Sequence, residues 1–244
     1  MMFFVRERPV QLDCFTSIPH VFDYAKISQN FKPDWFKKTP ALINNGSQQT
    51  IKNCAAFSQF YKHGIVIPSW FELELTIGST RDQFWCWESS TDTLQTNYSH
   101  SSDQFEGFAK GTGNNVKITS PWAFKTKDDI NFLWSQPTWN MRNTLFNFCV
   151  LPGVVEFKKQ HATNINLFIE YQQEKQFCKI PSLNPLVILH PLTEKKIEIK
   201  NHLVSENEIK RIKEGITHLY FNRNFLETLK NKRKILKKVF DKNT

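Results

Sequence analysis

Strict alternation of hydrophobic and polar residues marks the clearest element of the chain, residues 70–79, which read SWFELELTIG. The hydrophobic members of the alternation are Phe71, Leu73, Leu75 and Ile77. A period of two places successive side chains on opposite faces, so the pattern predicts a strand with one buried and one solvated face. A turn at residues 78–80 leads into residues 83–88 (QFWCWE), which are predicted to form the hairpin partner of this strand.

The stretch around which the chain is organised is residues 130–157, INFLWSQPTWNMRNTLFNFCVLPGVVEF. It is typical of a strand, a loop kinked at Pro137, a second strand, a turn and a third strand. The hydrophobic positions of this stretch are predicted to pack the interior. They are Leu133, Phe146, Phe148, Val150, Val154 and Val155.

Other extended runs follow one another at short spacing, which brings the total to about ten candidate strands. The runs are residues 3–5, 11–15, 116–119, 121–124, 165–171, 176–181, 185–192 and 195–201. Many short strands without intervening helices favour an antiparallel architecture over a βαβ fold. We therefore predict a mainly β domain over residues 1–200, an antiparallel β-sandwich or jelly-roll-like barrel. Residues 89–115, rich in Ser, Thr, Asn and Gly, are predicted to form a long loop.

Helical patterns are confined to three places. Residues 34–36 can form one helical turn, and Thr50 is a plausible N-cap for a helix that ends at Gly64. The third place is the C-terminal stretch, residues 201–244, where Ser205 and Glu208 have the spacing of a capping box. Hydrophobic residues then recur at helical spacing, so a helical appendage of two helices or one kinked helix is predicted.

The net charge of +9 is concentrated in that appendage. Residues 1–194 carry 18 basic and 17 acidic side chains, whereas residues 195–244 carry 14 and 6. The densest run, residues 230–238, supplies the candidate anion-binding residues Lys230, Lys232, Arg233, Lys234, Lys237 and Lys238. Such a surface can bind nucleic acid, an anionic membrane or an acidic partner without specificity, or it can be a solvated helix face. Self-association through the helices is the other role that the pattern suggests.

The cysteines are isolated and odd in number, which favours buried thiols in a reducing compartment over a disulfide framework. The N-terminus becomes charged after five residues and therefore lacks the apolar core of a signal peptide. No apolar run approaches the length of a membrane span. A cytoplasmic location is predicted.

The histidines do not show the short spacings that place two metal ligands on one face of an element. His161, in a turn, and His190, in a strand, are the weak candidates for a metal site assembled from separate strands. Ordinary buried histidines are the alternative. Neither the run HSSD at residues 100–103 nor the glycine-rich residues 107–113 has the context of a catalytic triad or a phosphate loop. The sequence identifies no cofactor.

Aromatic residues are the remaining candidates for binding. Trp134 and Trp139, with Gln136 and Asn140, surround Pro137, which forces an extended or turn conformation. These four side chains are predicted to point into a ligand-binding cleft, with core packing as the alternative for the two tryptophans.

Several segments together resemble an uncharacterised family, a domain of unknown function found in tailed phages of marine bacteria and in some bacterial genomes. The matching segments are residues 32–40, 50–70, 120–124, 132–140, 151–157 and 180–191. The chain departs from the pattern at Ala55 and Ala56, where the family has prolines. The resemblance implies a phage-type origin and a β-rich fold, and it transfers no catalytic residue.

Together these features favour a non-enzymatic binding or structural accessory protein of phage type. Such a protein would be virion-associated or would act in the host cytoplasm during infection, and it would associate through its helical tail. The alternative is a metal-dependent, oxygenase-like enzyme of the double-stranded β-helix type.

Overall fold

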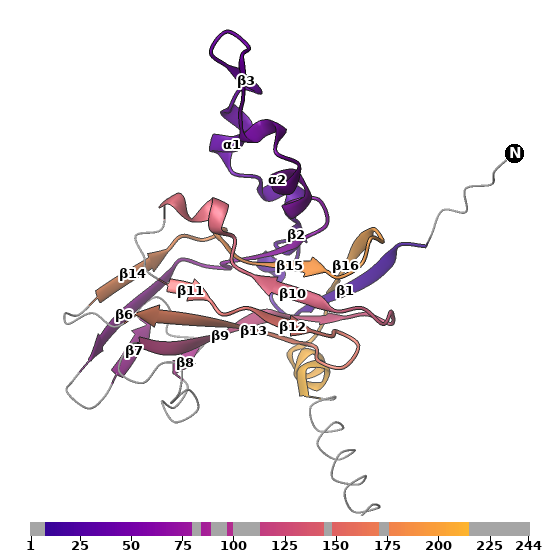
Figure 1. Ribbon diagram of the computed structural model, residues 1–244. Helices are drawn as coiled ribbons and strands as arrows, with labels where there is room; N and C mark the ends of the chain where they lie inside the picture. Colours follow the sequence, from indigo (N-terminus) through magenta and orange to yellow (C-terminus); the bar gives the residue numbers. More distant parts are fainter. Residues whose placement is uncertain are drawn as a thin grey trace, which may run out of the picture.

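A computed structural model describes residues 8–79, 84–88, 97–99, 113–143, 148–170 and 176–214 (Figure 1). Its architecture is mainly β, as predicted, and it consists of several largely antiparallel sheets. None of the sheets formed by the described residues closes into a barrel.

The larger sheet has the strand order β11–β13–β9–β1–β16, with β8 also paired to β9. The strands are β1 (Val10–Thr16), β8 (Asn97–Ser99), β9 (Gly113–Lys125), β11 (Phe148–Val150), β13 (Ala162–Glu170) and β16 (Ile197–Leu203). The pairs are antiparallel except for β1 and β16, which run parallel with Val10 opposite Ile197 and Thr16 opposite Leu203. The wholly antiparallel arrangement that we predicted is therefore wrong at this pair.

The second large sheet has the order β12–β10–β15–β5–β2. Its strands are β2 (Lys26–Ile27), β5 (Ile65–Pro68), β10 (Phe132–Ser135), β12 (Gly153–Val155) and β15 (Pro185–Pro191). A three-stranded sheet contains β14 (Gln176–Ile180), β6 (Leu73–Ser79) and β7 (Phe84–Glu88), which confirms the predicted hairpin of β6 and β7. A two-stranded hairpin contains β3 (Leu42–Ile43) and β4 (Gln48–Gln49).

The two large sheets bury one shared apolar core. Leu12, Ile118 and Ile165 enter it from the first sheet, and Phe132 and Val187 enter it from the second. Alternation along β13, where Thr163, Ile165, Leu167 and Ile169 are buried, shows how period two directs one face inward.

Within residues 130–157 the predicted interior is partly wrong. Phe148, Val150 and Val155 are buried, whereas Leu133 is 37% and Val154 61% exposed, and Phe146 lies outside the described residues. Phe132 and Trp134 are the buried residues of β10, because that strand turns its even-numbered positions to the core. Leu133 and Val154 are cross-strand neighbours on the opposite face.

Residues 28–61 form a projection, here called the arm, that rises from the second sheet (Figure 1). It contains η2 (Ser28–Phe31), α1 (Asp34–Lys38), the β3–β4 hairpin, η3 (Ile51–Asn53) and α2 (Ala55–Phe60). The predicted turn at residues 34–36 is confirmed by α1. The predicted helix from Thr50 is split, because Cys54 adopts an extended conformation (φ −73°, ψ 113°) between η3 and α2.

The helical appendage that was predicted from residue 201 starts later, because residues 201–203 belong to β16 and the described helical segment is residues 206–214. Its start confirms half of the capping box, since the Glu208 amide donates to Ser205 Oγ (3.3 Å). Ile209 is buried, and Lys213 Nζ donates to the Ser120 carbonyl (2.8 Å) at a bulge in β9. The first turns of this helix are therefore packed against the β domain. The candidate anion-binding residues at 230–238 lie outside the described residues.

Candidate binding site at the open edge of the second sheet

The four residues predicted around Pro137 do not share one cleft. Trp134 lies on β10 and is buried. The Gln136 side-chain oxygen accepts a hydrogen bond from the Val150 amide (3.0 Å) and so ties β10 to β11. Trp139 and Asn140 lie in the next element, η5 (Thr138–Asn143), at the base of the arm.

At that base the two residues brace the arm. Asn140 Oδ1 accepts from the Tyr61 hydroxyl (2.5 Å), and Asn140 Nδ2 donates to the Phe31 carbonyl (2.7 Å). The Trp139 carbonyl accepts from Trp35 Nε1 (3.1 Å). Trp139 remains 41% exposed, so its outer face stays in contact with solvent.

Trp134 lines a cavity of about 160 Å³ between the second sheet and β13 of the first. One wall is the segment from Leu151 to Val155, which crosses from β11 to β12. The other wall carries Gln160, Ala162, Asn164 and Asn166. The cavity thus lies directly beside β12.

β12 ends the second sheet within the described residues, so one of its edges has no strand partner there. Edge strands normally carry charges, prolines or bulges that prevent further pairing. On β16, which ends the first sheet, Glu198 and Lys200 serve this purpose. β12 itself is Gly153-Val154-Val155 and carries no charge, and only the preceding Pro152 restricts it.

The opposite wall of the cavity carries the amide side chains of Asn164 and Asn166. The Asn166 carbonyl oxygen of the backbone already accepts from the Leu151 amide (2.9 Å). Asn166 Oδ1 is buried without a hydrogen-bond partner among the described residues. A buried acceptor without a partner costs free energy, which a bound donor would recover. The arrangement suits the backbone of an extended peptide.

His161 and His190 lie in different surroundings. His161 is buried beside β9, where its Nδ1 lies 3.1 Å from the Phe124 carbonyl. His190, on β15, packs against Phe60 of the arm (4.7 Å between ring centroids). Burial lowers the pKa of both imidazoles below the ordinary value. Within the described ranges, no three His, Cys, Asp or Glu side chains gather closely enough to hold a metal ion.

The cysteine prediction is correct in part. Cys14 is buried, and burial raises the pKa of its thiol. Cys149, which was predicted to be buried, is exposed on β11. Among the helices of the described residues, none has both the length and the apolar character needed to cross a membrane.

Comparison with known proteins adds no assignment, because no protein-family model matches the chain and no curated protein is significantly similar to it. The assignment of a binding site at this edge therefore depends on its geometry. The sequence analysis placed a cleft around Pro137 instead, and of its four candidate residues Trp134 lines this cavity. Asn164 and Asn166 were missed because they lie on a strand that only folding brings to this edge.

Proposed function

We propose that this protein is a non-enzymatic binding protein that accepts an extended segment of a partner protein at the edge of β12 that no described strand occupies. In line with the phage-family resemblance, its role would be structural or accessory, in the virion or in the host-cell cytoplasm. The body would then be a β-sandwich, an arrangement that the single core shared by the two large sheets supports.

The observation that carries the proposal is the uncharged edge of β12, which pairs with no other described strand and lies beside a cavity lined in part by asparagine side chains. A strand added there gains backbone hydrogen bonds from β12. On one face its side chains would cover Val154 and Leu133, which are exposed neighbours. On the other face they would meet Trp134, Asn164 and Asn166. The preferred segment therefore alternates β-branched apolar residues with small polar ones.

The affinity of such a site is modest. An edge of three residues contributes few hydrogen bonds, and each is worth about 0.5–1.5 kcal/mol net. The buried area also falls well below the roughly 1,200 Å² of a stable interface. We expect dissociation constants on the order of 10–100 µM for a single segment.

Selection of peptides from a random display library, followed by fluorescence anisotropy, tests the proposal. Selected peptides are expected to bind saturably and to lose at least about tenfold in affinity to Val154→Lys, since lysine on an edge strand opposes pairing. Leu203→Lys is the matched control, because it places the same charge at an exposed leucine on the edge strand β16. Peptides that bind Val154→Lys as tightly as the unmodified protein would refute the proposal.

Association through the C-terminal stretch is a second part of the proposal, supported by its concentrated positive charge and by the start of a helix at residue 206. Because Ile209 and Lys213 belong to the body, the informative truncation ends at Glu214. Removal of residues 215–244 is expected to leave the thermal unfolding midpoint within a few degrees and to lower self-association or polyanion binding. Light scattering and heparin retention measure these effects. If the truncated protein had the same oligomeric mass by light scattering and the same retention on heparin as the full chain, the proposal would be contradicted.

A further inference from the structure

The β3–β4 hairpin forms the far end of the arm, away from the large sheets (Figure 1). Every residue from 41 to 49 is exposed, including Leu42 (49%) and Ile43 (40%). Leu42 lies opposite Gln49, and Ile43 lies opposite Gln48, so each face of the hairpin presents one apolar and one amide side chain. Neither face is covered by the described residues, so both are open to a partner.

The arm holds this exposed hairpin in one conformation. A two-stranded hairpin is only marginally stable in water, so its shape depends on other contacts. At the base, Thr50 Oγ1 donates to the Pro40 carbonyl (2.5 Å), and the Thr50 amide donates to the Ala41 carbonyl (3.1 Å). At the tip, Asn44 and Asn45 adopt left-handed backbone conformations (φ 51° and 54°), which asparagine tolerates better than most residues. The hairpin is thus a preformed projection, and a preformed shape lowers the entropy cost of binding.

The arm is also basic. It contains four lysines and a single acidic residue, Asp34, which gives a net charge of +3. Lys37 and the exposed Lys38 end α1 just before the hairpin, and Lys52 follows the hairpin in η3. Lys37 pairs with Asp34 (2.9 Å), whereas Lys52 Nζ is held by two carbonyls near the end of α1 (3.0 and 3.2 Å). Within the arm only one of these three cations is matched by a carboxylate, so the base of the hairpin favours an anionic partner.

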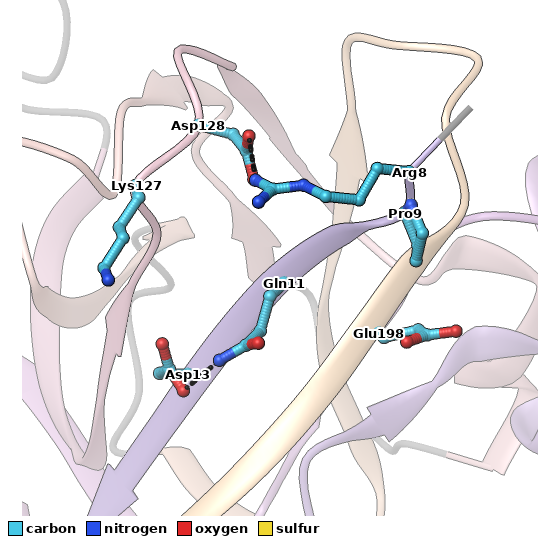
Figure 2. A pocket seen from close by; sticks show the side chains of 7 residues that line it. All are labelled: Arg8, Pro9, Gln11, Asp13, Lys127, Asp128 and Glu198. Carbon is cyan, nitrogen blue, oxygen red and sulfur yellow. Dashed lines mark hydrogen bonds and ion pairs between the residues drawn. The ribbon is translucent and has the colours of Figure 1, made fainter.

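The charge of the β body is balanced where a cavity of about 230 Å³ lies over β1 (Figure 2). That cavity is lined by the carboxylates of Asp13, Asp128 and Glu198 and by the cations Arg8 and Lys127. Figure 2 shows Arg8 reaching across β1 to Asp128, with which it forms an ion pair (3.1 Å). Positive charge is therefore not in excess there, and an anionic partner is expected at the arm instead.

The composition of the hairpin indicates which anionic partner fits. Four of its nine residues are asparagine or glutamine, and the tip reads Asn44-Asn45-Gly46. Inserting this tip into a lipid bilayer would remove water from the amides without replacing its hydrogen bonds. The major groove of B-DNA is about 12 Å wide and admits a two-stranded β-ribbon, and its base edges bond asparagine and glutamine amides. Leu42 and Ile43 can contact thymine methyl groups in the same groove.

We propose that the arm binds double-stranded DNA, with the β3–β4 hairpin in the major groove and Lys37, Lys38 and Lys52 on the flanking phosphates. The inference goes beyond strand addition at β12 and polyanion binding by the C-terminal stretch, because neither of those elements takes part. Three phosphate contacts give a slope of about −3 for the logarithm of affinity against the logarithm of salt concentration.

Hydrogen exchange of the full chain, measured by mass spectrometry with and without a short A·T-rich DNA duplex, locates the contact. Amides of residues 41–53 are expected to exchange at least about threefold more slowly at saturating duplex. The measurement separates the arm from the basic C-terminal stretch, which can bind DNA by itself. Protection confined to residues 215–244 would overturn the inference.

Fluorescence anisotropy with the same duplex tests the assigned side chains. Lys38→Met should weaken binding about fivefold at low salt and make the salt slope less steep by about 1. Asn45→Gly keeps the left-handed backbone and removes one amide, so it should weaken binding about threefold without changing the slope.

Lys195→Met is the matched control, because Lys195 is an exposed lysine of the β body and the change in net charge is the same. It should leave the affinity unchanged. Equal weakening by Lys38→Met and Lys195→Met would indicate a general charge effect and overturn the inference. The absence of saturable duplex binding would also overturn it, as would binding of the arm to phosphatidylserine vesicles but not to the duplex.

Discussion

Replacement of Trp122 by alanine is expected to lower the free energy of unfolding by about 3–5 kcal/mol, the range for loss of a large buried aromatic side chain. Trp122 is fully buried in β9, and its ring meets Trp70 edge to face (5.7 Å, 90°). Its Nε1 donates to the carbonyl of Val21 (3.2 Å), the last residue of the short helix η1 (Pro19–Val21). The side chain therefore connects the first sheet to two segments that no strand ladder reaches.

The bulge around Trp122 prevents the surrounding residues from filling the space that the ring would leave. Between Thr119 and Ala123, β9 has two more residues than β13 has between Asn164 and Ala162. Buried hydrogen bonds hold the extra residues, since Thr163 Oγ1 donates to the Trp122 carbonyl (2.8 Å) and also contacts Ser120 Oγ. A backbone fixed in this way relaxes little, so alanine leaves a cavity.

Urea unfolding followed by far-ultraviolet circular dichroism measures this prediction. Trp122→Phe should lower the free energy of unfolding by less, about 1–2 kcal/mol. It keeps an aromatic ring but leaves the Val21 carbonyl without the donor of Trp122. Leu203→Ala, at an exposed position, is the control and should change stability by less than about 0.5 kcal/mol. A loss below about 1 kcal/mol for Trp122→Ala would contradict the assigned role.

The strand pattern was predictable where alternation is local. Residues 165–171 and 70–79 contain their own evidence of an inward face, and strands are found at residues 162–170 (β13) and 73–79 (β6). The parallel pairing of β1 with β16 was not predictable, because nothing in Val10–Thr16 identifies a partner at Ile197–Leu203. Such a pairing depends on the packing of the whole chain.

The wrong prediction of which β10 residues face the core also arises because local sequence was not sufficient. Phe132, Leu133 and Trp134 are consecutive apolar residues, so alternation cannot decide which of them face inward. Leu133 was assigned to the core, but its exposed side chain instead forms part of the surface beside β12. Together with its cross-strand neighbour Val154 it forms an exposed apolar pair next to the edge at which we propose strand addition.

Gln136 and Asn140 were predicted to point into a ligand-binding cleft, whereas in the structure both side chains bond to other parts of the chain. Asn140 is placed by the turn of η5 to bond Tyr61 and Phe31, which lie far away in sequence. Local sequence indicates that such a side chain has an unusual position, yet it cannot show whether its partner is a ligand or the chain itself. Here the partner is the arm.

Replacement of Phe57 by alanine is expected to detach the arm while the β body stays folded. Phe57 is buried at the centre of the arm, stacked on Phe36 (4.0 Å between ring centroids) and in contact with Trp35, Tyr61 and Trp139. This cluster is separate from the main core, and it meets the second sheet through Val66 and Ile188 and through the packing of Phe60 on His190. The arm therefore loses about 3–5 kcal/mol of its folding free energy, because the substituted side chain lies at the centre of its own cluster.

Native-state hydrogen exchange distinguishes this local effect from global unfolding. Amides of α1 and α2 should lose protection on the order of 100- to 1,000-fold in Phe57→Ala, whereas those of β9 and β13 should keep theirs, because their ladder and the main core are untouched. Phe22→Ala removes an exposed phenylalanine and should change neither set. If β9 and β13 lost protection in parallel with the arm, the arm and the body would form one cooperative unit. The aromatic cluster would then be a second core of the domain, and the separate packing of the arm would not amount to independent stability.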